Sequence, residues 1–345
     1  MHRKLVLTAI IVLILSISGG IGTGIVTAQD PPPPPPDGGG GNPPPPPDGG
    51  GGGPSGTTDF GSAMTAELDI TSFETFGDAL AAQVAAGDGA GIDMFFRNSG
   101  VVINEEAGTY FAVNGVHPVN QGDYSSYYPK SIVEASLEDD SIVNVYSFSS
   151  VNGHDVDMEA LSWGPSPEYL YIGDEYNYIY EMELATGTIT REWNLADIGV
   201  STGTDRGIEA MTYSPVTGYF YAGIQDSGEV HVLDLGLDSD GATVTLIETW
   251  PLPQGWAPSG LYGHPDGTIW AVSMSGGGGS GQQMIFHEEA DGTLICAISI
   301  PAALNMTRPD GIIFDSTDEN IYIVDSQGPI NNGFSLYKVA WTNPC

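Results

Sequence analysis

Three carboxylates recur at matching points along the chain. Glu159, Glu209 and Asp310 each stand at the start of a short apolar run, and a polar turn and a second apolar run follow each of them. Carboxylate oxygens are the ligands that hard divalent cations such as Ca²⁺ prefer. If the fold brings the three residues together, they form a candidate cation site.

The elements that carry these residues repeat with a nearly constant period. The first apolar runs begin at Ser99, Glu159, Glu209, Ser259 and Asp310, in steps of 60, 50, 50 and 51 residues. The pattern of all-strand units at about this period is typical of β-propeller blades. We predict an all-β fold, a β-propeller of four-stranded blades. Five units can be counted, and six are possible if the N-terminal segment supplies more strands.

The last unit lacks a fourth strand, and a ring of blades has to close. We predict that residues 66–70 or 92–96 supply the missing strand. Between them, Ser72 is a suitable N-cap for a short helix that ends near Ala86, with Phe73, Phe76, Leu80 and Val84 on one face. We expect this helix to pack across one mouth or the flank of the ring.

In a propeller, the start of each blade's first strand and the end of its second strand meet at one face. Glu159, Glu209 and Asp310 should therefore surround the upper mouth of the axis, and Asp174 and Asp325 are further candidate metal ligands beside them. The same geometry brings two candidate ligand-binding residues, Asn114 and Gln225, to this face.

Converging carboxylates repel one another unless they are protonated, paired with a base or bound to a cation. Arg97, Arg206 and Arg308 precede the first strand in three units. One interpretation is that these arginines neutralise the acids. The other is that the acids hold Ca²⁺. The sequence leaves both open.

Other residues near this face could contribute chemistry or binding. His154 and Asp157 are weak candidates for a catalytic acid or base. Four aromatic residues could form a stacking platform for a sugar or another ring: Tyr124, Tyr127, Tyr128 and Trp256. The alternatives are a solvated histidine and aromatic rings that only pack the loop.

Two short runs resemble known propeller families. Arg308-Pro-Asp-Gly-Ile-Ile-Phe-Asp with Ile321-Tyr-Ile-Val-Asp resembles a repeat of the gluconolactonase/regucalcin-like propellers. Asp157-Met-Glu-Ala-Leu with Tyr169-Leu-Tyr-Ile-Gly-Asp resembles the SdiA-regulated and phytase-like families. The resemblance implies a calcium-binding propeller, with lactone or phosphoester hydrolysis in some members. Glu159 and Asp310 match positions of the lactonases' axial ligands, whereas Pro258-Ser-Gly260 replaces their Pro-Asn-Gly, and those families usually have six blades.

The N-terminal part of the chain has the composition of an export signal and a spacer. Residues 1–28 contain a basic start, an apolar run and the small-residue sequence Val26-Thr-Ala28, as in a cleaved signal peptide. Residues 29–63 are rich in proline and glycine, which predicts a disordered linker. We assign residues 64–345 to the propeller domain, with 64–95 closing or capping the ring, and expect a secreted or cell-surface protein.

The charge balance limits the partners. Eight Lys and Arg residues face 44 Asp and Glu residues, a net charge of −36. This surface repels nucleic acids and anionic membranes, so we expect neither as a direct partner. The expected partner is a small molecule, a glycan or an envelope component.

The chain has two cysteines, Cys296 and Cys345. In an exported protein an even number permits a disulfide bond. We predict that the two are bonded, with two free thiols as the alternative.

Two functional hypotheses follow from the sequence. The first is an exported propeller that binds a ligand and holds Ca²⁺ at an acidic axial site. The second is an extracellular metal-dependent hydrolase of a lactone or a phosphoester, in which the cation polarises the substrate oxygen.

Overall fold

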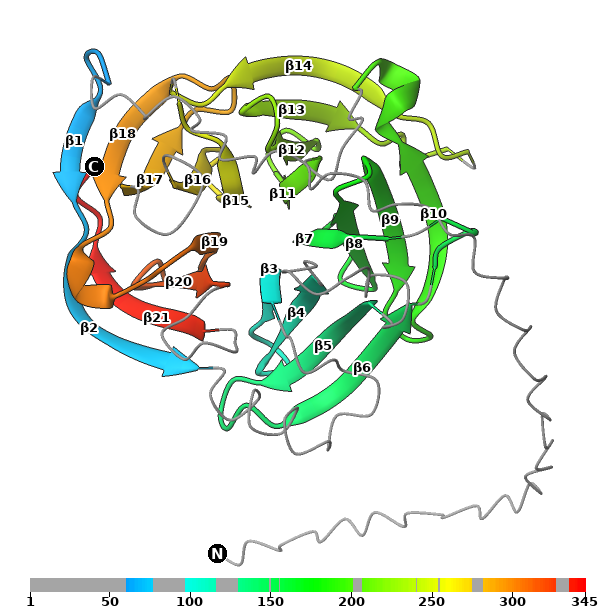
Figure 1. Cartoon of the computed structure of the whole chain (residues 1–345), viewed down its shortest axis with the longest axis horizontal. Coiled ribbons are helices and arrows are strands. Elements are labelled where there is room, and N and C mark those ends of the chain that lie inside the picture. The colour runs from blue at the N-terminus through cyan, green and yellow to red at the C-terminus, as the bar shows by residue number, and fades with distance from the viewer. Residues whose placement is uncertain are drawn as a thin grey trace, which may run out of the picture. The chain divides into compact units, whose positions relative to one another are not determined.

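Five β-sheets stand around a central axis as the blades of a propeller (Figure 1). The computed structural model describes residues 60–76, 97–115, 130–148, 150–154, 156–200, 207–239, 241–253, 255–274, 282–326 and 335–345. Among these residues the only helices are two short 3₁₀ turns, η1 (Leu195–Ile198) and η2 (Ala302–Leu304). The predicted all-β propeller of four-stranded blades is confirmed, and the described residues form five blades.

The first three blades are each built from four consecutive strands. Their strands, from the axis outward, are β3 (Arg97–Asn104), β4 (Thr109–Gly115), β5 (Lys130–Ser136) and β6 (Ile142–Phe148) in blade 1; β7 (Met158–Trp163), β8 (Tyr169–Asp174), β9 (Tyr178–Glu183) and β10 (Thr188–Asn194) in blade 2; and β11 (Ile208–Tyr213), β12 (Phe220–Ile224), β13 (Glu229–Asp234) and β14 (Thr245–Pro251) in blade 3.

The last two blades also take strands from the N-terminal segment. Blade 4 contains β15 (Pro258–Gly263), β16 (Ile269–Met274), β17 (Gln283–Glu288), β18 (Leu294–Ser299) and, outermost, β1 (Met64–Glu67). Blade 5 contains β19 (Pro309–Phe314), β20 (Asn320–Asp325), β21 (Ser335–Thr342) and, outermost, β2 (Asp69–Phe76).

The ring closes through these two N-terminal strands. β2 pairs antiparallel with β21, and β1 pairs in parallel with β18. Closure of the last blade by an N-terminal strand is confirmed, but this strand is β2, which shares only residues 69 and 70 with the predicted range 66–70; the other predicted range, 92–96, lies outside the described residues. The predicted helix is wrong for residues 72–76, and its remainder lies outside the described residues. An unpaired β21 edge offers backbone hydrogen bonds along its whole length, and pairing with it outweighs the weak helical pattern.

Burial follows the position of each strand in its blade. The inner strand β7 is buried along almost its whole length, whereas the outer strand β14 is exposed at all but one residue. Apolar clusters fill the spaces between neighbouring blades; for example, Phe111 of blade 1 packs with Leu161 and Ile172 of blade 2. Because these clusters hold both faces of the inner strands, the residues that face the axis have little freedom to move.

The predicted disulfide bond is confirmed. Cys296 of β18 is bonded to Cys345, with the two Cα atoms 6.1 Å apart. Figure 1 places the C-terminus beside β18 and β1. The bond therefore fastens the C-terminal residues to the blade that also holds the first strand, and it indicates a non-cytoplasmic location.

The predicted signal peptide (residues 1–28), residues 29–59 of the predicted linker and residues 77–96 lie outside the described residues. None of the helices that the structure describes is long and apolar enough to cross a membrane.

Candidate axial site

A β-bulge sits at the same point of the inner strand in each blade. The pairing of the first two strands shifts register at Glu159, Glu209, Ser259 and Asp310, and between Asn98 and Val101 in blade 1. A bulge leaves one residue outside the ladder and turns its side chain in a new direction. The repeated bulge therefore explains why the aligned acidic residues leave the blade and reach the axial mouth.

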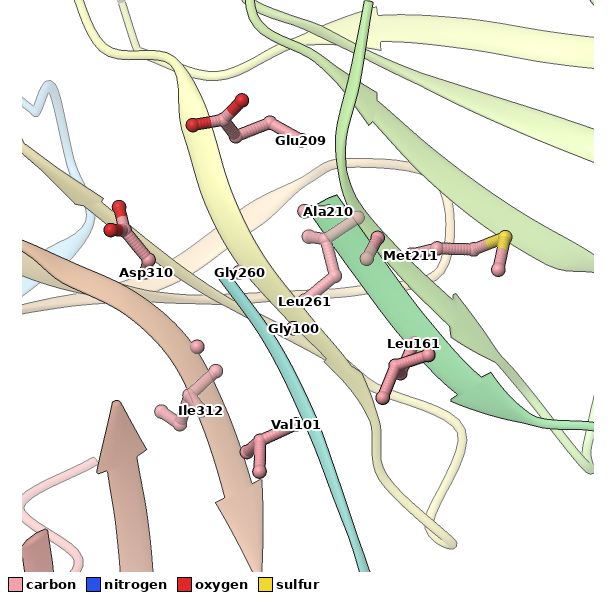
Figure 2. A pocket seen from close by; sticks show the side chains of 12 residues that line it. Gly100, Val101, Leu161, Glu209, Ala210, Met211, Gly260, Leu261, Asp310 and Ile312 are labelled. Atoms are coloured by element: carbon pink, nitrogen blue, oxygen red, sulfur yellow. The ribbon is translucent and has the colours of Figure 1, made fainter. Parts of the chain in front are cut away.

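Below this ring the axis is narrow and apolar. The residue after each bulge is glycine or alanine, and a Cβ atom added at Gly260 would lie only 2.5 Å from Gly311 Cα. Small residues are needed here because neighbouring inner strands approach so closely. The small cavity on the axis is lined by these small residues, by apolar side chains such as Leu161 and Ile312, and by Glu209 and Asp310 (Figure 2).

Arg308 joins the two acids of blades 3 and 5. Its Nη2 donates to Glu209 Oε1 at 2.6 Å, and its Nε donates to Asp310 Oδ1 at 3.0 Å. Gln225 Nε2 donates a second hydrogen bond to Glu209 Oε1, at 3.0 Å. The interpretation that arginines neutralise the acids is thus confirmed for Glu209 and Asp310, because Arg308 pairs with both. The side chains of Arg97 and Arg206 lie outside the described residues.

Arg308 leaves half of each carboxylate without a partner. Glu209 and Asp310 are only 2% and 1% exposed, and within the described part of the chain Glu209 Oε2 and Asp310 Oδ2 accept no hydrogen bond. Burial raises the pKa of Asp310 to about 7, although the Arg308 guanidinium acts in the opposite direction. Buried carboxylate oxygens without donors are rare in folded proteins, and a functional role, such as binding an ion, is one explanation for them.

A second acidic group lies in blade 2. Asp157, Glu159 and Glu175 are buried, and each offers a carboxylate oxygen within 4.8 Å of those of the other two. Burial, together with the negative charges of Glu159 and Glu209, raises the pKa of Glu175 far above its usual range, and its carboxyl group contacts Glu209. The buried acids of blades 2, 3 and 5 are therefore one electrostatic unit that can accept a cation.

Asp174 and Asp325, two predicted metal ligands, each accept hydrogen bonds from two backbone N–H groups. Asp174 accepts the backbone N–H groups of Asp157 and Tyr176, both at 2.7 Å. Asp325 accepts those of Thr307 and Arg308, at 2.7 and 2.9 Å. In blades 2 and 5, the last residue of the second strand thus holds the segment that enters the first strand. Metal ligation by Asp174 or Asp325 stays a prediction, but their observed contacts position the neighbouring site residues.

Glu175 is the site residue that sequence reasoning missed. The residue after the second strand is Glu175 in blade 2, Gln225 in blade 3 and Ser326 in blade 5. Gln225 donates to Glu209, and the Ser326 side chain lies near Asp310 and lowers the pKa of that carboxyl group. The same alignment of repeats that identified the first ring, extended by one residue beyond the second strand, would have identified Glu175.

His154 and Trp256, two further predicted residues, are engaged in contacts within their own blades. His154 is 45% exposed, stacks on Tyr178 at 4.9 Å and lies 3.7 Å from Glu192, so it belongs to the outer part of blade 2. Trp256 is buried and meets Phe286 edge-on at 5.3 Å, which leaves its ring unavailable for stacking on a ligand. Tyr124, Tyr127, Tyr128 and the side chain of Asn114 lie outside the described residues.

No protein family and no curated protein matches the chain. Among solved structures, the glutaminyl cyclase of Myxococcus xanthus is 14% identical, with a TM-score of 0.51 over 81% of this chain and 100% of that chain. The β-propeller domain of Cps50 (Swd1) from Myceliophteria thermophila and the WD40 repeats of RRP9 are each 11% identical. Their TM-scores are 0.40 and 0.42, over 66% and 80% of this chain and 62% and 99% of theirs.

The similarity to the glutaminyl cyclase supports the fold and no particular activity. The chain is a β-propeller protein with a buried acidic cluster at one end of its axis, and this cluster has the composition of a site for a metal ion.

Proposed function

We propose that this protein is an exported binding module that holds one Ca²⁺ ion at the axial mouth and uses it to bind a ligand. The observation that carries the proposal is the pair of buried carboxylate oxygens, Glu209 Oε2 and Asp310 Oδ2, that accept no hydrogen bond from the described residues, beside three further buried acids. Ionised carboxylates are costly to bury, by several kcal/mol each, unless a cation compensates them.

The donor set selects the kind of ion. Asp157, Glu159 and Glu175 offer only oxygen atoms, and their spacing of up to 4.8 Å suits ligands that each lie about 2.3–2.6 Å from a shared Ca²⁺ ion. Glu209 is a further candidate ligand, because its carboxylate lies next to that of Glu175. Without histidine or cysteine among these residues, hard cations are favoured over zinc.

The ligand would lie above the ion, outside the cavity. The small residues of the inner strands narrow the axis, and the cavity next to Glu209 and Asp310 has room for only about one water molecule. We propose that a small molecule, a glycan or an envelope component completes the coordination of the ion from the solvent side. The disulfide bond supports an extracytoplasmic setting, where Ca²⁺ is available.

A Ca²⁺ titration of the folded chain by calorimetry, with thermal unfolding alongside, tests the proposal. We expect one ion per chain, with stability rising by about 2.7 kcal/mol when free Ca²⁺ is a hundred times Kd. Glu159→Gln should abolish both effects, whereas Glu248→Gln, an exposed residue of the outer strand β14, should change neither. No heat of binding and no shift in unfolding would contradict the proposal.

One observation favours the alternative, a metal-dependent hydrolase of a lactone or phosphoester. Burial raises the pKa of Asp310 to about 7, and a carboxyl group that titrates near neutral pH is suited to general acid–base catalysis. The cation would polarise the substrate oxygen. Turnover of lactone, ester or phosphoester substrates that requires Ca²⁺ and is lost in Asp310→Asn would favour this alternative over the binding module.

A further inference from the structure

Arg308 connects two blades that are not neighbours. Glu209 belongs to β11 of blade 3 and Asp310 to β19 of blade 5, while β15 of blade 4 lies between them. Arg308 donates to both acids, at 2.6 and 3.0 Å, so its guanidinium spans the mouth where blade 4 presents only Ser259 at its bulge. The guanidinium therefore stands between two facing carboxylates, as a metal ion would.

The charge of this guanidinium is permanent. The carboxylates of Asp310, Glu209 and Glu159 all stabilise the cationic form and raise the pKa of Arg308 above its ordinary value. Its side chain is 24% exposed, whereas those of Glu209 and Asp310 are almost fully buried. Unlike a bound ion, this cation cannot dissociate.

The hydrogen bonds at Glu209 divide its carboxylate between two neighbours. Oε1 accepts from both Arg308 and Gln225, while Oε2 accepts from none of the described residues. The same carboxyl group contacts Glu175, which belongs to the acidic group of blade 2. Arg308 thus holds one side of Glu209 and leaves the other side available next to Asp157, Glu159 and Glu175.

We propose that the axial mouth is a site for two cations, in which Arg308 is the built-in second cation and a metal ion beside Asp157, Glu159 and Glu175 is the first. The metal ion beside Asp157, Glu159 and Glu175 rests on the proposed function, whereas the role of Arg308 between Glu209 and Asp310 does not. The protein then takes one metal ion, and loss of the guanidinium opens a second metal position between Glu209 and Asp310.

The test is the number of Ca²⁺ ions bound per chain, measured by equilibrium dialysis with elemental analysis. We expect one ion in the wild type and two in Arg308→Gln, because Glu209 and Asp310 then share no guanidinium. Arg191→Gln is the matched control: Arg191 lies 3.2 Å from the buried Glu181, away from the axis, and its removal should leave the count at one. Adding Glu209→Gln and Asp310→Asn to Arg308→Gln should return the count to one or fewer.

The outcomes separate this inference from the proposed function. One ion in both the wild type and Arg308→Gln overturns the second position and leaves the proposed function standing. No ion in the wild type but one in Arg308→Gln refutes the proposed function and supports the second position. No ion in either protein overturns both.

Arg308→Gln is expected to fold in Ca²⁺ and to lose stability in EDTA. If it folds in neither buffer, Arg308→Lys tests the same point, because its ammonium keeps the positive charge. Arg308→Lys should bind one ion and stay folded in EDTA; two bound ions, or unfolding in EDTA, would contradict the role of Arg308 as the second cation.

Discussion

Replacement of Asp325 by alanine distinguishes a positioning residue from a metal ligand. Asp325 is fully buried, and its two oxygens accept the backbone N–H groups of Thr307 and Arg308. These two residues lead into β19, which carries Asp310. The aspartate therefore fixes the backbone from which both Arg308 and Asp310 reach the axis.

The size of the effect follows from these contacts. A hydrogen bond to a charged acceptor contributes about 1.5–3 kcal/mol, and two of them give a loss of about 3–6 kcal/mol in the free energy of unfolding. A domain of this size gains roughly 0.6 kcal/mol of unfolding entropy per degree at its midpoint, so Tm should fall by about 5–10 °C. The substitution also leaves two partly buried N–H groups without this acceptor, which adds to the expected loss.

The assay is thermal and urea unfolding in EDTA and again in saturating Ca²⁺. A residue that only ligates the ion would lower stability in Ca²⁺ and leave the EDTA measurement unchanged or improved. If Asp325 positions the backbone, Asp325→Ala lowers stability by a similar amount in both buffers. An unchanged midpoint in EDTA would refute this reasoning.

Asp315→Ala serves as the control. Asp315 accepts hydrogen bonds from Thr317 and Asn320 in the turn at the other end of the same two strands. It is partly exposed, so its loss should cost less than the loss of Asp325. Its distance from the axial mouth means that the Ca²⁺ affinity should not change.

Two further predictions concern the closure of the ring and the protonation of the axial acids. Cys345→Ala removes a bond between residues 49 apart in sequence, so unfolding should become easier by about 4 kcal/mol; a urea midpoint equal to that of the oxidised wild type would contradict this. In EDTA, stability should fall as the pH rises from about 4 to 7, because burial raises the pKa of Asp310 from 3.8 to about 7 and the folded protein holds a proton that the unfolded chain releases. Urea midpoints across this range, with a less steep dependence in Asp310→Asn, are the check; midpoints in EDTA that rise with pH would show that the sign is wrong.

The sequence by itself determined the five repeated units and where the first strand of each unit begins. Each blade is a local pattern of apolar runs and polar turns, and such a pattern can be recognised without knowledge of distant contacts. Because the bulge occurs at the same point in each repeat, the alignment also placed Glu159, Glu209 and Asp310 in one ring. With only two cysteines in the chain, the disulfide bond had a single possible pairing.

The tertiary structure alone decided how these residues are used. Arg308 and Glu209 are 99 residues apart in sequence, and only the closed ring brings them to 2.6 Å. Similarly, the sequence shows that Asp325 ends a strand near the mouth, but its oxygens are occupied by backbone groups that become neighbours only when the blade has formed.

The N-terminal strand β2 illustrates the same limit. Residues 72–76 carry a weak helical pattern, yet they form a strand because the edge of β21, at the far end of the chain, needs a partner. Local spacing therefore determined which residues face the axis. Contacts between distant parts of the chain decided which acids pair with Arg308, which carboxylate oxygens accept no hydrogen bond from the described residues, and which strand closes the ring. The reason is that charge pairing and strand pairing depend on separation in space and not in sequence.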